Sequence, residues 1–115
     1  DGLEAIRERL RRDLDNARWF SEQVEAAPDW QVIAPVNLQT VCVRHIPGLG
    51  SGQALEGEAL DAHTLDWVGR INTSGDAFLS LSVLDGRWMV RVSIGVESTT
   101  REHVARLWQL LQEAV

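Results

Sequence analysis

The side chains best suited to binding a ligand are those of one arginine, Arg91, and two serines, Ser80 and Ser82. They lie on either side of the dipeptide Asp85-Gly86. Asp-Gly between two alternating apolar segments is typical of a two-residue hairpin turn, because both turn positions need a positive φ. Such a turn pairs Ser80 with Arg91 and places Ser82 diagonally beside it on the same face. A guanidinium presents a fork of donors that suits a carboxylate or phosphate. The sequence therefore indicates a position suited to binding an anion such as a carboxylate or phosphate.

The alternation of side chains divides residues 77–94 into two faces of opposite character. The face predicted to pack against helices is wholly apolar: Ala77, Leu79, Leu81, Val83, Trp88, Val90, Val92 and Ile94. The face of Arg91 also carries Phe78, Ser80, Ser82, Leu84, Arg87, Met89 and Ser93. The simpler interpretation of this second face is a solvated surface with scattered polar residues. Mixed apolar and arginine content is also typical of a contact surface, which makes Phe78 and Met89 candidate interface residues.

The other reactive residues match no catalytic or metal-binding motif. Cys42 and the three histidines, His45, His63 and His103, show no short ligand spacing. We expect His45 to end a strand, the other two histidines to lie on helix surfaces, and Cys42 to be an inert buried thiol. A Ser-His-Asp arrangement stays open, although no G-x-S-x-G motif is present. Residues 48–52 resemble a phosphate loop only in their glycines, so a flexible connector is the better interpretation.

Hydrophobic periodicity predicts the elements that must position these side chains. The first helix should end before Pro28, the second, over residues 59–74, should stop at Gly75, and the third should follow a capping box at Thr99 and Glu102. The apolar face of the first helix holds Leu3, Ile6, Leu10, Leu14, Ala17, Ser21 and Val24. That of the second holds Leu60, Thr64, Trp67, Val68 and Ile71, and that of the third holds Val104, Leu107, Trp108, Leu111 and Val115. The strands are Trp30 to Ala34, Gln39 to Ile46, Ala77 to Leu84 and Arg87 to Ile94. The order α-β-β-α-β-β-α predicts an α+β fold, a four-stranded antiparallel sheet with helices mainly on one face.

Trp19 lies almost opposite the apolar stripe of the first predicted helix. An indole there should be exposed unless other protein covers it. We therefore interpret Trp19 as a candidate interface residue.

Composition excludes several classes of protein. The 115 residues are 44% hydrophobic and 24% charged, with a net charge of −6 at pH 7, which is ordinary for one soluble domain over residues 1–115. Negative charge repels phosphate backbones and anionic lipid headgroups, so we expect neither nucleic acid nor a membrane as a partner. The lone cysteine and the absence of an apolar signal segment agree with a cytoplasmic location.

Two absences suggest that the chain is a segment of a longer protein. It does not begin with methionine, and all eleven of its basic residues other than histidine are arginines. Without a lysine, covalent chemistry between a side-chain amine and a carbonyl cofactor is impossible within these residues.

Several segments resemble the C-terminal end of pyridoxal-phosphate-dependent amino-acid decarboxylases of the aromatic-L-amino-acid decarboxylase group. The segments are VCVRH at 41–45, RINTSG at 70–75, LDGRWMVRVSIG at 84–95 and TTREHV at 99–104. The resemblance implies the C-terminal small domain of a fold-type-I enzyme that releases CO2 from an L-amino acid. It also implies that the cofactor lies on a large domain of the same parent chain, that this segment alone binds no cofactor and is inactive, and that the parent is a homodimer.

The resemblance also implies a role for Arg91, which matches an arginine that in some relatives lies on the active-site side and engages the substrate carboxylate. Ser80 and Ser82 would then face the substrate as well. An arginine–carboxylate contact can orient the scissile bond against the cofactor ring. A different class of protein remains as the alternative: a stand-alone α+β module of the ferredoxin-like or ACT type that binds a ligand or dimerises.

Overall fold

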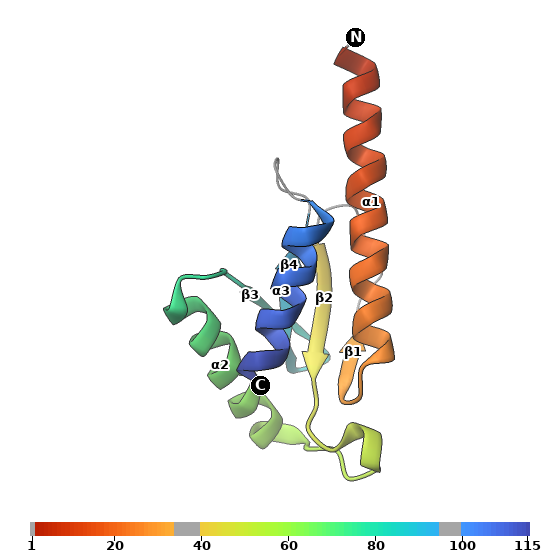
Figure 1. Ribbon diagram of the computed structural model, residues 1–115. Helices are drawn as coiled ribbons and strands as arrows, with labels where there is room; N and C mark the ends of the chain where they lie inside the picture. Colours follow the sequence, from red (N-terminus) through yellow and green to blue (C-terminus); the bar gives the residue numbers. More distant parts are fainter. Residues whose placement is uncertain (1, 34–39, 95–99) are drawn as a thin grey trace.

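In the computed structural model, which describes residues 2–33, 40–94 and 100–115, the chain forms helices and strands in the predicted order (Figure 1). The elements are α1 (Gly2–Ala26), β1 (Trp30–Val32), β2 (Thr40–His45), a 3-10 turn η1 (Leu49–Ser51), α2 (Gly57–Ser74), β3 (Ser80–Leu84), β4 (Arg87–Ser93) and α3 (Arg101–Ala114). Three positions that entered the predictions, Ala34, Gln39 and Thr99, lie outside the described residues.

The described strands form one antiparallel sheet in the order β1-β2-β4-β3. The predicted hairpin register is confirmed by the pairs Ser80–Arg91, Ser82–Met89 and Leu84–Arg87. Asp85 and Gly86 have φ angles of 53° and 76°, the positive values that a tight hairpin turn needs. β3 begins only at Ser80, so Phe78 lies before the strand and outside its ladder.

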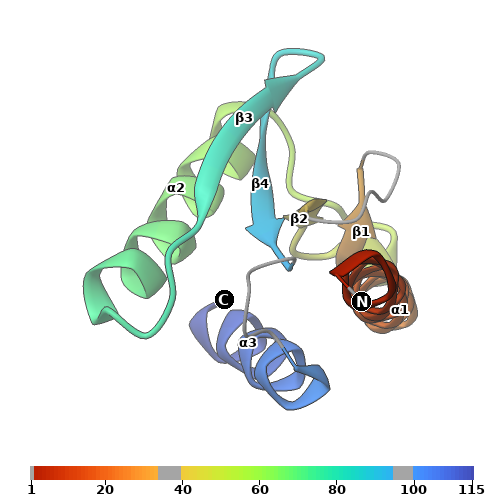
Figure 2. The ribbon, with the colours of Figure 1, turned by 90° about the horizontal axis from the view of Figure 1, so that it is seen from above.

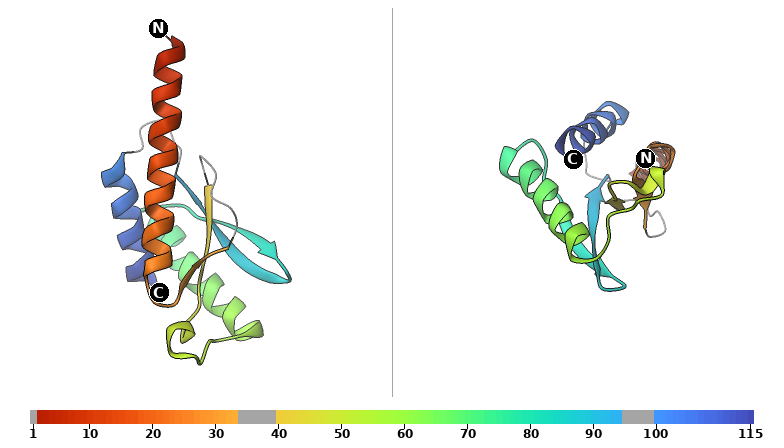
Figure 3. Two further views of the ribbon diagram at one scale, coloured as in Figure 1. Left: turned by 90° about the vertical axis from the view of Figure 1, so that its right-hand side faces the viewer. Right: turned by 90° about the horizontal axis from the view of Figure 1, so that it is seen from below.

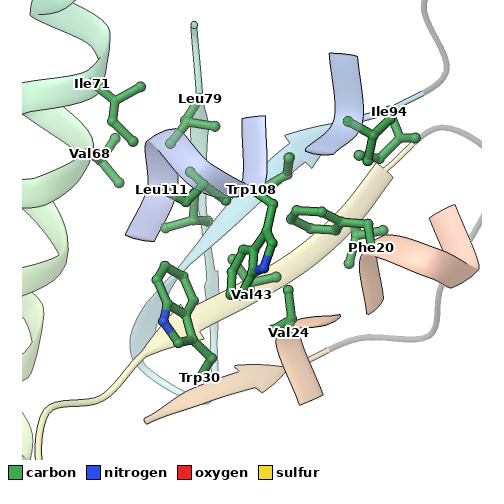
Figure 4. Close-up of a cluster of buried hydrophobic side chains, with 14 of the residues drawn as sticks. Phe20, Val24, Trp30, Val43, Val68, Ile71, Leu79, Ile94, Trp108 and Leu111 are labelled. Atoms are coloured by element: carbon green, nitrogen blue, oxygen red, sulfur yellow. The ribbon is translucent and has the colours of Figure 1, made fainter. Parts of the chain in front are cut away.

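All three helices lie on one face of the sheet, as predicted (Figure 2). The valines that the sheet directs toward them, Val41, Val43, Val90 and Val92, are fully buried. Between the layers, the Trp30 ring meets Trp67 of α2 and Trp108 of α3 edge-on, with centroids 5.6 and 5.0 Å apart. Figure 4 shows Trp30 and Trp108 in this core. Burying such large aromatic groups joins the sheet to two helices at once.

α2 agrees with its prediction in every buried position: Leu60, Thr64, Trp67, Val68 and Ile71. It ends at Gly75, whose φ of 79° is the left-handed conformation that favours glycine at a helix C-terminus. α3 buries three of the five residues expected on its apolar face, Val104, Trp108 and Leu111, whereas Leu107 is half-buried and Val115 is 39% exposed. Its N-cap is Thr100, whose side chain accepts a hydrogen bond from the backbone N–H of His103 at 3.3 Å; the predicted capping residue Thr99 lies outside the described residues.

The apolar face of the hairpin is only partly covered. Leu79, Val90, Val92 and Ile94 are buried, but Trp88 is half-buried and Val83 is 53% exposed. The expectation that this whole face packs against helices was therefore wrong near the turn.

The predicted apolar stripe of α1 is buried only in its second half. Leu3 and Ile6 are 56% and 57% exposed and Leu10 is 43% exposed, because the first half of this 25-residue helix projects beyond the sheet (Figures 1 and 3). The residues that α1 buries are Asp13, Asn16, Ala17, Phe20, Ser21 and Val24. No helix among the described residues combines the length and the apolar character needed to cross a membrane.

The connector between β2 and α2 is held in place, contrary to the expected flexible loop. The side-chain carboxylate of Asp29 accepts a hydrogen bond from the backbone N–H of Gly50 at 2.7 Å. The backbone carbonyl oxygen of Asp29 accepts one from the N–H of Ile46 at the same distance. Gly48 has a φ of 83°, and a Cβ there would lie 2.2 Å from the carbonyl oxygen of Gln53. The loop therefore needs glycine at position 48 for its shape, and not for a phosphate.

Candidate functional site

The face of the sheet away from the helices holds the candidate anion-binding position. We call it the outer face and define it by Cys42, Ser80, Ser82, Met89 and Arg91. Arg91 is exposed on β4 and stands between its paired neighbours, Cys42 on β2 and Ser80 on β3. The small side chains on both sides leave a guanidinium room to approach a ligand. The helices leave the outer face open (Figure 3).

Two other arginines near Arg91 are already engaged. The guanidinium of Arg44 donates its Nε–H to the carbonyl oxygen of Trp88 at 3.0 Å and its Nη2 to those of Leu84 and Arg87 at 2.9 and 3.2 Å. Arg87 pairs with the carboxylate of Asp61 at 3.4 Å.

Arg91 differs from these two arginines. Within residues 2–33, 40–94 and 100–115 its guanidinium makes no hydrogen bond or ion pair. Its full set of donors is therefore open to a ligand. Sequence reasoning did not find the anchoring role of Arg44, because nothing in the sequence shows that its guanidinium reaches the hairpin turn.

Cys42 lies on the outer face and not in the core. It is a free, half-buried cysteine opposite Arg91. The expectation of a buried thiol was wrong because the core side of β2 is taken by its neighbours Val41 and Val43, which are fully buried. Alternation along the strand then places the side chain between them on the other face.

The candidate interface residues differ in exposure. Phe78 is 80% exposed, and Met89 is half-buried opposite Ser82. Trp19 is not the exposed indole that was expected: it is half-buried against the core, and the guanidinium carbon of Arg101 lies 5.0 Å from its ring centroid. The helix wheel misplaced it because α1 buries a face around Phe20, rotated from the apolar stripe of its projecting half.

Two histidines that no sequence motif connects meet in the fold. His45, at the end of β2, and His63, on α2, are joined by a hydrogen bond of 2.8 Å between Nδ1 and Nε2. Burial, and then the neighbouring His63, lower the pKa of His45 to about 4. His63 was expected on a helix surface and is instead half-buried in this pair. His103 is exposed on α3, as predicted.

Metal chemistry has no visible basis in this part of the chain. Among the described residues, no three histidine, cysteine, aspartate or glutamate side chains converge in a way that could hold a metal ion. The histidine pair supplies only two nitrogens, fewer than the three or four protein ligands of typical zinc sites.

The fold belongs to a class of domains present in larger solved enzymes. The chain superposes on part of the crystal structure of Oryza sativa TDC with PLP, with a TM-score of 0.87 and 27% identity, covering 96% of this chain and 23% of that one. The crystal structure of Rhodiola rosea 4-hydroxyphenylacetaldehyde synthase aligns with a TM-score of 0.76 and 30% identity, over 91% of this chain and 21% of that chain. No family model matches the chain.

Sequence comparison agrees with the fold. The chain is 29% identical over 112 residues to tryptophan decarboxylase 1 of Oryza sativa subsp. japonica, an alignment that covers 97% of this chain and 22% of that protein. The chain is similar to the C-terminal segment of aromatic-L-amino-acid decarboxylases, as the resemblance of its motifs indicated. It thus spans about a fifth of the length of such relatives.

Proposed function

We propose that this chain is the C-terminal small domain, residues 1–115, of a longer fold-type-I decarboxylase that uses pyridoxal phosphate to release CO2 from an aromatic L-amino acid. The observation that carries the proposal is the match of almost the whole chain, in sequence and fold, to one segment of much longer enzymes. In this proposal the segment shapes the active site and is inactive alone.

The cofactor itself does not fit this segment. Pyridoxal phosphate is held in its enzymes by a covalent bond to a lysine, and none of the 115 residues is a lysine. In the proposed enzyme, the large domain of the same chain would hold it. The side chains contributed here would bind and orient the substrate or pack against that domain.

Arg91 is the residue that we propose to face the substrate. It is exposed, lacks a partner among the described residues, and has Ser80 beside it on β3 with Ser82 diagonal to it. A charge-assisted hydrogen bond to a carboxylate would fix one end of the amino acid. Fixing that end would orient the bond to be broken.

The projecting half of α1 is the surface that we propose to pack on the large domain. Its leucine and isoleucine side chains lie on one stripe and are about half exposed. An isolated half-helix of this length is marginal in water without a partner. Met89 on the outer face and Phe78, just before β3, would add contacts to the large domain. The half-buried Trp19 on α1 would add another. We further propose that the longer protein is a cytoplasmic homodimer, with no nucleic acid or membrane as a partner.

The alternative of a stand-alone ferredoxin-like or ACT module is not favoured. That fold alternates its elements as β-α-β-β-α-β. Here α1 and α2 are each followed by two strands that are consecutive in the chain and paired with each other.

The experiment is an absorbance titration with pyridoxal phosphate of both the longer polypeptide and the 115-residue segment. We expect one cofactor per chain in the longer polypeptide, and in the segment only the weak signal that a terminal amine gives. Stoichiometric cofactor binding by the segment alone would contradict the proposal.

A further inference from the structure

A polar link between two histidines joins the first half of α2 to the end of β2. His45 Nδ1 and His63 Nε2 are 2.8 Å apart, and the ring centroids are 5.0 Å apart. The Trp30 ring packs on His45 at 4.8 Å and also meets Trp67 of α2. The pair thus lies where the start of β1 and the end of β2 meet α2.

The number of protons decides whether this link can exist. A hydrogen bond between two imidazoles needs one donor and one acceptor nitrogen. Two neutral rings satisfy this condition, and so do one neutral and one protonated ring. Two protonated rings present donors to each other and add two positive charges at close range. The hydrogen bond can therefore form when one of the two rings is protonated, and it cannot form when both are.

The surroundings keep both rings neutral near pH 7. Burial, followed by the adjacent His63, lowers the pKa of His45, while Asp29 in the turn before β1 opposes the shift. Burial, followed by Arg70, lowers the pKa of His63, and Asp66 opposes it. Arg70 and Asp66, both on α2, are themselves paired.

A second polar contact lies close to His63 on α2. The carboxylate of Asp61 accepts from the backbone N–H of Trp88 at 3.2 Å and from Arg87 at 3.4 Å. Because Asp61 and His63 are two residues apart on the helix, a displacement of this turn disturbs both contacts. The histidine pair is thereby connected to the tip of the hairpin that carries Arg91.

We propose that His45 and His63 form a pH-sensitive latch that holds the first half of α2, and through Asp61 the hairpin tip, while at least one of the two rings is neutral. Acidification releases the latch. This inference stands on the contacts above and does not depend on the proposed enzymatic function.

The direction of the pH effect follows from the lowered proton affinity of the closed pair. Released histidines take up protons near their ordinary pKa of about 6.5, while His45 in the closed pair has a pKa of about 4. The released state therefore binds more protons between these values. The stabilisation by the latch is complete above about pH 6.5 and decreases as the pH falls toward about 4.

Hydrogen–deuterium exchange with mass spectrometry tests the latch on the longest polypeptide that carries this chain. Exchange is compared at about pH 7.5 and about pH 5, with rates corrected for intrinsic chemistry. We expect peptides over the first half of α2 and over residues 84–89 to lose at least about tenfold more protection than peptides over α3, since one unit of pKa difference changes the opening equilibrium about tenfold.

Two matched substitutions locate the effect. His63→Gln keeps a donor and an acceptor beside His45 but does not titrate, so the extra loss of protection at low pH should shrink to the part that the burial of His45 contributes. His103→Gln makes the same change at the exposed histidine of α3 and should leave the extra loss intact. A full pH response in His63→Gln would overturn the proposal. If that variant does not fold, the wild-type series decides, because equal loss over α2 and α3 would also overturn it.

Discussion

Asn72 in the last turn of α2 and Leu79 just before β3 exchange two hydrogen bonds. The Nδ2 of Asn72 donates to the carbonyl oxygen of Leu79 at 3.0 Å, and its Oδ1 accepts from the N–H of Leu79 at 2.7 Å. The amide side chain thus takes the place of a neighbouring strand for a residue whose own side chain is buried. This contact fixes where the chain returns from α2 to the sheet, and gives the asparagine of the RINTSG segment a structural role.

Replacing Asn72 by alanine should leave both backbone groups of Leu79 without a protein partner. We expect Asn72→Ala to lower the free energy of unfolding by about 2–3 kcal/mol, since each partly buried polar group left unpaired costs about 1–3 kcal/mol. Chemical denaturation of the chain measures this loss. Thr73→Ala, at the exposed next residue of α2, is the control and should cost less than about 1 kcal/mol. Equal losses in the two variants would refute the role of Asn72.

Arg44 should stabilise the hairpin turn. Its guanidinium donates to three carbonyl oxygens in residues 84–88. Arg44→Met keeps much of the side-chain volume and removes the donors, so we expect a loss of about 1–2 kcal/mol in unfolding free energy, discounted because water can reach part of this site. Arg106→Met, at an exposed position on α3, should change stability by less than about 0.5 kcal/mol. A turn held mainly by Asp85 and Gly86 would instead make the Arg44 variant as stable as its control.

Arg91 should matter for activity and not for folding. In the longer enzyme we expect Arg91→Ala to lower kcat/KM about 10- to 100-fold, the loss of one charge-assisted hydrogen bond to substrate. Arg91→Lys should recover part of the activity, because lysine keeps the charge but lacks the planar fork. Steady-state kinetics with a thermal melt as the folding check measure both effects. Unchanged kinetics in Arg91→Ala would show that Arg91 is an ordinary surface residue without a role in binding the substrate.

The apolar stripe on the projecting half of α1 should contribute to stability only in the longer polypeptide. Leu3→Ser combined with Ile6→Ser should leave the isolated segment unchanged within about 0.5 kcal/mol, because both side chains are already more than half exposed there. In the longer polypeptide the same pair should lower the melting temperature, because the apolar stripe is then buried. Arg9→Ser, also exposed on α1, is the control. An unchanged melting temperature in the longer polypeptide would show that this stripe stays in water.

The elements that follow their own local pattern were predictable from the sequence. α2 has one apolar stripe and ends at a glycine. Its hydrophobic periodicity alone therefore predicted all of its buried residues. The hairpin register followed from the Asp85-Gly86 turn, because a two-residue loop leaves only one pairing.

The features that depend on distant contacts were not predictable. A helical wheel shows which face of α1 is apolar, but only the position of the sheet and α3 decides that its first half projects and that Trp19 packs under Arg101. The His45–His63 contact joins residues from a strand and a helix, and no spacing rule brings them together. Cys42 is a simpler case, because the alternation of side chains along β2 places it on the face opposite to the buried Val41 and Val43.

The most direct measurement is the product of the longer polypeptide supplied with pyridoxal phosphate and aromatic L-amino acids. We expect CO2 and the corresponding amine in equal amounts, detected by isotope release and mass spectrometry. An aldehyde in place of the amine would favour the reaction named for the Rhodiola rosea relative. Release of no CO2 from any aromatic amino acid, by a folded protein with bound cofactor, would contradict the proposed decarboxylase.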